Sequence, residues 1–112
     1  MLLEELREAL PNMEIILIEP FVQKGEATAE KLEAFQTGVA ERAAIVRKIG
    51  EKFSLTVVPM QPDLDQFEPK APMGYWLVDG VHPTGVFHQY MADKLVPIIS
   101  AHLDSVKDDE TI

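Results

Sequence analysis

Apolar positions along the chain follow two patterns, helical spacing and short unbroken runs. The longest helical pattern lies between residues 28 and 53, where apolar residues recur every three or four positions. Such a stripe predicts one long helix with a buried face, and Thr28 is placed to cap its start. Similar spacing predicts a first helix that ends before Pro11 and a last helix that begins at about Gly85, after Thr84 as its N-cap. Pro97 is expected to kink or divide that last helix.

Two short apolar runs predict strands. Met13–Glu19 holds four consecutive apolar residues, three of them isoleucine, which is typical of a parallel strand covered on both faces. Leu55–Val58 predicts a second strand, and Gln61–Pro72 a loop with one short helix around Asp63–Phe67. Strand, long helix and strand make a βαβ unit, so the chain is expected to be an α/β protein.

Composition narrows the possible functions. Hydrophobic residues make up 46% of the 112 residues, there is no cysteine, and the formal net charge is −9. The absence of cysteine excludes disulfides and thiolate chemistry. The acidic excess argues against nucleic acid and anionic membranes as partners, because both require a basic face. No run is long enough to span a membrane, and no signal peptide is visible at the start, so a cytoplasmic location is expected.

The segment from Tyr75 to Thr84, YWLVDGVHPT, carries the candidate chemistry. An acid, Asp79, stands three residues before His82 in a loop that opens a helix. Gly80 lets the loop bend, and Pro83 favours an extended backbone at the histidine. A carboxylate that accepts the Nδ1 proton of an imidazole fixes its tautomer, as in a catalytic triad. A turn-closing acid beside a helix-flanking histidine is the structural alternative.

This segment resembles the last conserved block of GDSL-type (SGNH) serine ester hydrolases. The stretch Leu10–Phe21, LPNMEIILIEPF, is also similar to a strand of that family. The resemblance implies that Asp79 and His82 are triad members. It also implies the C-terminal part of a three-layer α/β/α parallel-sheet (flavodoxin-like) fold. On this view residues 1–105 form a partial hydrolase domain and residues 106–112 an acidic polar tail.

The family's Gly-Asp-Ser nucleophile block and its Gly-x-Asn-Asp oxyanion block are absent. The serines present, Ser54, Ser100 and Ser105, lie outside any nucleophile-elbow context. We therefore expect a chain that is inactive alone, needs no cofactor and no metal, and serves a small ester substrate in a complete protein.

Residues at the expected strand ends are candidates for a substrate pocket. Phe21 and Met60 follow the two strands, and Trp76 precedes the Asp79 loop. Ligands of open α/β sheets bind beyond the carboxyl ends of the strands. Ordinary loop packing for Phe21 and Met60, and a core position for Trp76, are the alternatives.

Two other functions are compatible with the sequence. The chain could be a non-catalytic interaction module that self-associates, or that associates with a missing N-terminal half, through an exposed strand edge. A metal-dependent hydrolase would use Asp79, His82 and His88, although a fourth ligand is not evident.

Overall fold

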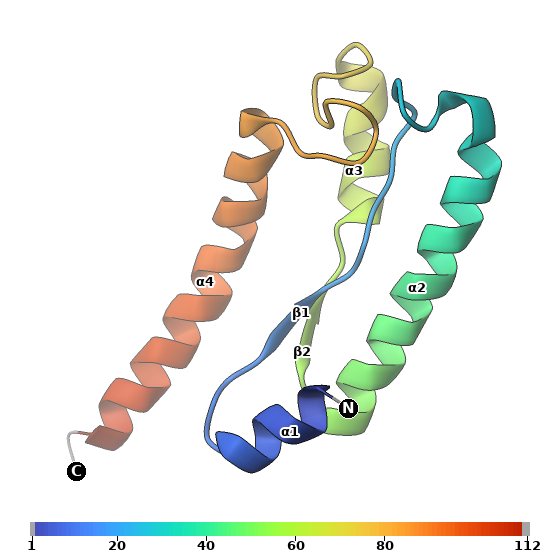
Figure 1. Cartoon of the computed structure of the whole chain (residues 1–112). Coiled ribbons are helices and arrows are strands. Elements are labelled where there is room, and N and C mark those ends of the chain that lie inside the picture. The colour runs from blue at the N-terminus through green and yellow to red at the C-terminus, as the bar shows by residue number, and fades with distance from the viewer. Residues whose placement is uncertain (1, 111–112) are drawn as a thin grey trace.

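The computed structural model describes the backbone of residues 2–110 and the side chains of residues 2–104. The helices and strands, in chain order, are α1 (Leu2–Ala9), β1 (Ile16–Ile18), α2 (Leu32–Phe53), β2 (Thr56–Val58), α3 (Gln61–Phe67) and α4 (Gly85–Glu110) (Figure 1). Two 3₁₀ turns, η1 (Ala29–Lys31) and η2 (Glu68–Lys70), precede α2 and follow α3.

The predicted parallel βαβ unit is confirmed. β1 and β2 pair in parallel, with Leu17 opposite Val57. Helix α2 packs on one face of this pair so closely that a Cβ atom at Gly50 would lie 2.2 Å from Cγ2 of Val57. Only glycine allows the helix to approach the strand this far.

The three-layer α/β/α fold is wrong for this chain. Among residues 2–110 the sheet has only two strands, each of three residues, and helices make up most of the structure. Of the apolar run Met13–Glu19, only Ile16–Ile18 has a partner strand. The run Tyr75–Val78 contributes one isolated bridge, Leu77 to Pro83, rather than a strand. Two parallel strands cannot form the wide sheet that a three-layer fold requires.

The predicted helices are present, with changes at their ends. Helix α4 begins at Gly85 as expected, and the backbone N–H of Phe87 donates to Oγ1 of Thr84, 3.3 Å away, so Thr84 caps it. The helix continues through Pro97 and includes residues 106–110 of the expected tail; residues 111–112 lie outside the described residues. Thr28 makes no side-chain capping bond, and α2 begins only at Leu32.

The core lies at the end of the molecule that carries the Asp79 loop. Leu64, Leu77 and Phe87 are fully buried there, surrounded by partly buried aromatic and apolar side chains. The ring of Phe67 stacks on Trp76, with 5.0 Å between their centroids. At the other end the strands and the far half of α4 are spread apart (Figure 1). The molecule therefore measures 55 × 28 × 18 Å. None of the described helices is long and apolar enough to cross a membrane.

Candidate functional site

Asp79 and His82 lie at the tip of a loop that is closed by backbone hydrogen bonds. The N–H of Val78 donates to the carbonyl of His82 at 2.8 Å, and the N–H of Thr84 donates to the carbonyl of Trp76 at 2.9 Å. The Thr84 hydroxyl also donates to the carbonyl of Tyr75, 2.8 Å away. These bonds bring the two sides of the loop together, so that the segment between them must turn back on itself.

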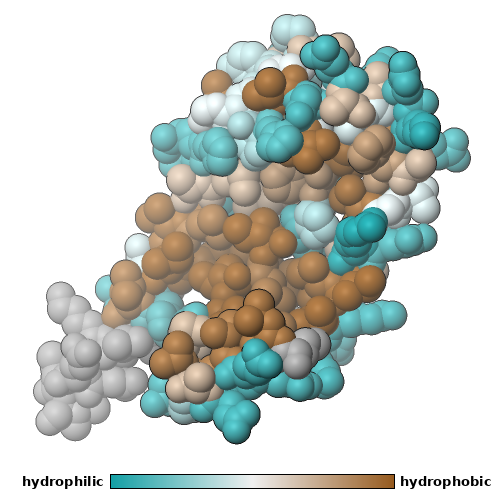
Figure 2. Space-filling model, in the orientation of Figure 1, coloured by the Kyte–Doolittle hydropathy of each residue, from teal (hydrophilic) through white to brown (hydrophobic). Residues whose placement is uncertain are grey.

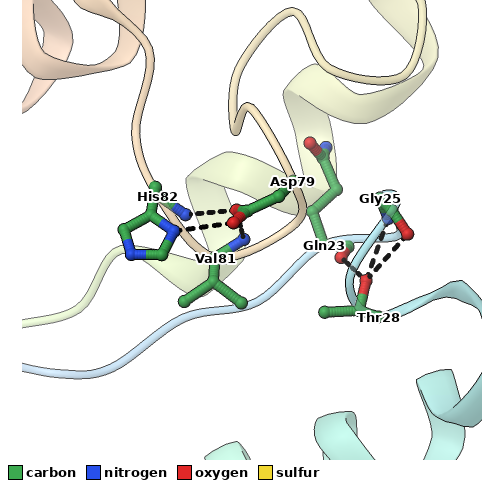
Figure 3. Close-up of polar contacts among 6 residues, drawn as sticks. All are labelled: Gln23, Gly25, Thr28, Asp79, Val81 and His82. Atoms are coloured by element: carbon green, nitrogen blue, oxygen red, sulfur yellow. Dashed lines mark hydrogen bonds and ion pairs between the residues drawn. The ribbon is translucent and has the colours of Figure 1, made fainter.

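The Asp79 carboxylate organises this turn and contacts the imidazole (Figure 3). Its Oδ1 accepts hydrogen bonds from the backbone N–H of Val81 at 2.9 Å and of His82 at 2.8 Å. Its Oδ2 lies 2.7 Å from Nδ1 of His82. One carboxyl group thus fixes both the backbone and the ring of the histidine.

Gly80 is required by the shape of the turn. Its φ is +98°, which L side chains rarely adopt. A Cβ atom here would also lie 2.5 Å from the carbonyl oxygen of Gln23 and 2.5 Å from Oγ1 of Thr28. The prediction that glycine allows this bend is therefore confirmed.

A second loop, residues 23–28, bonds to the backbone of the Asp79 loop. The N–H of Gln23 donates to the carbonyl of Gly80 at 3.0 Å, and the N–H of Ala27 donates to the carbonyl of Asp79 at 2.9 Å. Gly25 allows the two backbones to meet, because a Cβ atom on it would lie 2.3 Å from the carbonyl carbon of Asp79. We call residues 23–28 the support loop.

Thr28 holds the support loop in shape and is fully buried. Its hydroxyl donates to the carbonyl of Gln23 at 2.6 Å and accepts from the N–H of Gly25 at 2.9 Å (Figure 3). The sequence analysis treated this threonine as a helix cap and missed the support loop. The Lys24-Gly25 turn signal is visible in the sequence, but nothing there shows which distant loop it touches.

The electrostatics of the pair define the proton positions. The hydrogen bond from the backbone N–H of His82, and then those from its ring and from the N–H of Val81, lower the pKa of Asp79 well below its ordinary value. An ionised carboxylate only accepts hydrogen bonds, so Nδ1 of His82 must carry a proton. In the neutral imidazole, Nε2 then holds a free lone pair. The His82 side chain is 77% exposed, and none of the described residues bonds to Nε2.

No family model, curated protein or solved structure matches this chain. Interpretation of the site therefore depends on its own geometry.

The three predicted pocket residues lie in the core around the loop. Met60 is fully buried, and Phe21 meets the ring of Phe87 edge-on at 5.4 Å. Trp76 donates its indole N–H to the carbonyl of Phe67 at 3.0 Å. A cavity of about 210 Å³ lies between α2, α3 and the segment after β1, but none of the predicted site residues lines it.

None of the serines with described side chains meets His82. Ser54 is the C-cap of α2, in a left-handed conformation with φ of 55°, and that end of α2 lies at the opposite end of the molecule from the loop (Figure 1). Ser100 lies well along α4. The side chain of Ser105 is outside the described residues. A metal group of Asp79, His82 and His88 is not assembled: within residues 2–104 no three acidic or histidine side chains converge in a way that could hold an ion.

Proposed function

We propose that Asp79 and His82 are the acid–base pair of a serine ester hydrolase whose nucleophile is supplied by another polypeptide segment. The observation that carries the proposal is the 2.7 Å contact between Oδ2 of Asp79 and Nδ1 of His82, combined with a free, exposed Nε2. The resemblance of the Asp79-Gly-Val-His82-Pro-Thr segment to GDSL-type hydrolases adds to it.

The roles follow from the proton positions. Nε2 of His82 takes the proton of a serine hydroxyl while the serine oxygen attacks the ester carbonyl, and the imidazolium then protonates the departing alcohol. In the second half, Nε2 of His82 removes a proton from water while the water oxygen attacks the acyl-serine carbonyl, and the imidazolium then returns a proton to the departing serine oxygen as the acid is released. Asp79 keeps Nδ1 protonated and stabilises the imidazolium in both halves.

The chain alone is expected to be inactive. Loss of the nucleophile typically costs on the order of a million-fold in hydrolases of this type. The oxyanion donors must also come from the segment that brings the serine. The proposed substrate is a small ester, as the resemblance to GDSL-type hydrolases implies for the complete protein.

The test compares this chain with a longer polypeptide that contains it together with the coding segment upstream of Met1. We expect a Gly-Asp-Ser sequence there, labelling of the longer protein by a fluorophosphonate, and hydrolysis of p-nitrophenyl acetate. His82→Ala should abolish both, whereas Asp79→Asn should lower the hydrolysis rate about 10⁴-fold. Labelling that is unchanged by His82→Ala, or an upstream segment without a nucleophile, would show that the proposal is wrong.

A non-catalytic role in association is the second candidate. The observation in its favour is the set of large apolar side chains that the far end of the molecule leaves in solvent, among them Val96 at 56% and Leu103 at 59% exposure. The test compares the dissociation constants for self-association of the wild-type 112-residue chain and of Asp79→Asn. Equal constants would show that the association does not depend on the acid–base pair.

A further inference from the structure

The chain exposes more surface than a protein of its mass normally does. Its accessible area is 7733 Å², whereas folded monomers of 12.5 kDa expose about 6,200 Å². Its radius of gyration is 16.7 Å, against roughly 13 Å for a compact domain of this length. The excess of about 1,500 Å² is larger than the roughly 800 Å² that each partner buries in a standard interface.

Part of the exposed surface is apolar. Figure 2 shows hydrophobic surface running from α4 across the strands. The exposed large apolar residues of these elements include Ile18 of β1 and Val96, Ile99 and Leu103 of α4. The three α4 residues share one helical stripe, because they are spaced three and four positions apart. We call these four residues the apolar face.

The face of the sheet opposite α2 belongs to this region. Val57 faces Gly50 of α2, so Leu17, its partner in register, faces α2 as well. Side chains alternate along a strand, which places Ile16 and Ile18 on the other face. Glu14 follows the same alternation, and its carboxylate lies 3.6 Å from Nδ1 of His102 in α4. Helix α4 therefore borders this face without covering Ile18, which remains 39% exposed.

The backbone of β1 also has an open edge. The N–H of Glu19 donates to the carbonyl of Val58 at 3.0 Å, so residues 17 and 19 direct their peptide groups toward β2. Successive residues of a strand direct these groups to opposite sides. The N–H and C=O groups of Ile16 and Ile18 thus point away from β2, and no third strand pairs with them among residues 2–110.

We propose that two copies of this chain form a two-fold dimer through the open edge of β1 and the apolar face. In an antiparallel pair, Ile16 of one copy exchanges N–H···O bonds with Ile18 of the other. A two-fold axis makes this contact self-complementary. The axis runs perpendicular to the joined sheet, so Ile16 and Ile18 of the two copies adjoin on one face and the apolar faces of the copies lie side by side. The excess area is larger than one partner buries in a standard interface, so a second copy is sufficient to cover the face.

The experiment measures association of the 112-residue chain by sedimentation and light scattering. At about 100 μM, well above a micromolar dissociation constant, we expect twice the 12.5 kDa mass of one chain. Ile99→Lys places a charge in the apolar face and should raise the dissociation constant at least about tenfold. The matched control is Ile45→Lys, since Ile45 is 54% exposed on the outer side of α2 and should leave the constant within about twofold.

Hydrogen exchange provides a readout that does not depend on these variants. The amides of Ile16 and Ile18 should exchange slowly in the dimer and rapidly at concentrations where it dissociates. A monomer at all concentrations, equal effects of Ile99→Lys and Ile45→Lys, or fast exchange at Ile16 and Ile18 in an associated sample would overturn the proposal. Asp79→Asn should dimerise like the wild type, so failure of the hydrolase proposal would not be mistaken for failure of this one.

Discussion

Gly25 offers a sharp test of the contact between the support loop and the Asp79 loop. Alanine at this position would place its Cβ 2.3 Å from the carbonyl carbon of Asp79 and 2.3 Å from the amide nitrogen of Gly80. Ordinary contacts to a Cβ begin near 3.4 Å. The two backbones must therefore separate by about 1 Å, and backbone atoms cannot rotate aside as a flexible side chain can.

The cost follows from the bonds that this separation breaks. The Gln23–Gly80 and Ala27–Asp79 hydrogen bonds cross the contact, and each is worth about 1 kcal/mol net. The buried Thr28 hydroxyl loses good geometry as well, and an unsatisfied buried group costs about 1–3 kcal/mol. We expect Gly25→Ala to lower the free energy of unfolding by about 3–5 kcal/mol, a large share of a typical domain's stability.

Urea unfolding followed by tryptophan fluorescence measures this effect, because Trp76 is the single tryptophan and precedes the Asp79 loop. Gly85→Ala is the matched control: a Cβ there meets nothing within 4 Å, and the position opens α4. It should change stability by less than about 1 kcal/mol, in the stabilising direction. Both variants are compared at one protein concentration, since association shifts apparent stability. The reasoning is refuted if Gly25→Ala unfolds at the wild-type midpoint, or if Gly85→Ala is destabilised equally.

Two further predictions concern pH. Hydrogen bonds lower the pKa of Asp79 in the folded chain. The stabilisation that they give is therefore present above the ordinary carboxyl pKa of about 3.9 and is lost as pH falls below it. Acid unfolding of Asp79→Asn should be less steep in this range, and an unchanged unfolding profile would count against the role of the carboxylate. Burial, followed by the hydrogen bond to Asp63, raises the pKa of Tyr90 from 10.0 to about 12, so this stabilisation is complete below pH 10 and is lost as pH rises toward 12. Tyr90→Phe should flatten that alkaline loss in circular-dichroism melts, whereas an equally steep loss would show that Tyr90 is not its source.

Local patterns in the sequence predicted the elements and the acid–base contact. Asp79 and His82 are three residues apart, with a glycine between them, and that spacing alone brings the two side chains within reach. The helical stripe of α2 and the isoleucine-rich run of β1 depend on neighbours in sequence in the same way. These features could be predicted because short-range geometry determines them.

Long-range contacts could not be predicted in this way. The support loop meets Asp79 and Gly80 across more than fifty residues of chain, and no periodicity reports such a meeting. The three-layer fold was inferred from a resemblance and from one apolar run. An apolar run shows that a strand prefers burial, but it does not show how many strands the sheet has or which surface covers it. The apolar run therefore predicted the strand β1 but not that Ile18 within it remains exposed.

The bonds that hold Asp79 and His82 in place do not involve the apolar face. Asp79 and His82 are held by bonds within their own loop, and the support loop bonds to the backbone of Asp79 and Gly80. Trp76 and Leu77, which precede this loop, belong to the aromatic core. No residue of the apolar face takes part in those bonds. The contact between Asp79 and His82 is therefore in place before any partner binds. Association should consequently leave the Nδ1 contact unchanged, and Ile99→Lys should weaken the dimer while the ¹⁵N shifts of the His82 ring stay at their wild-type values. If the tautomer of the His82 ring changed when the dimer dissociated, the state of the acid–base pair would instead depend on the dimer.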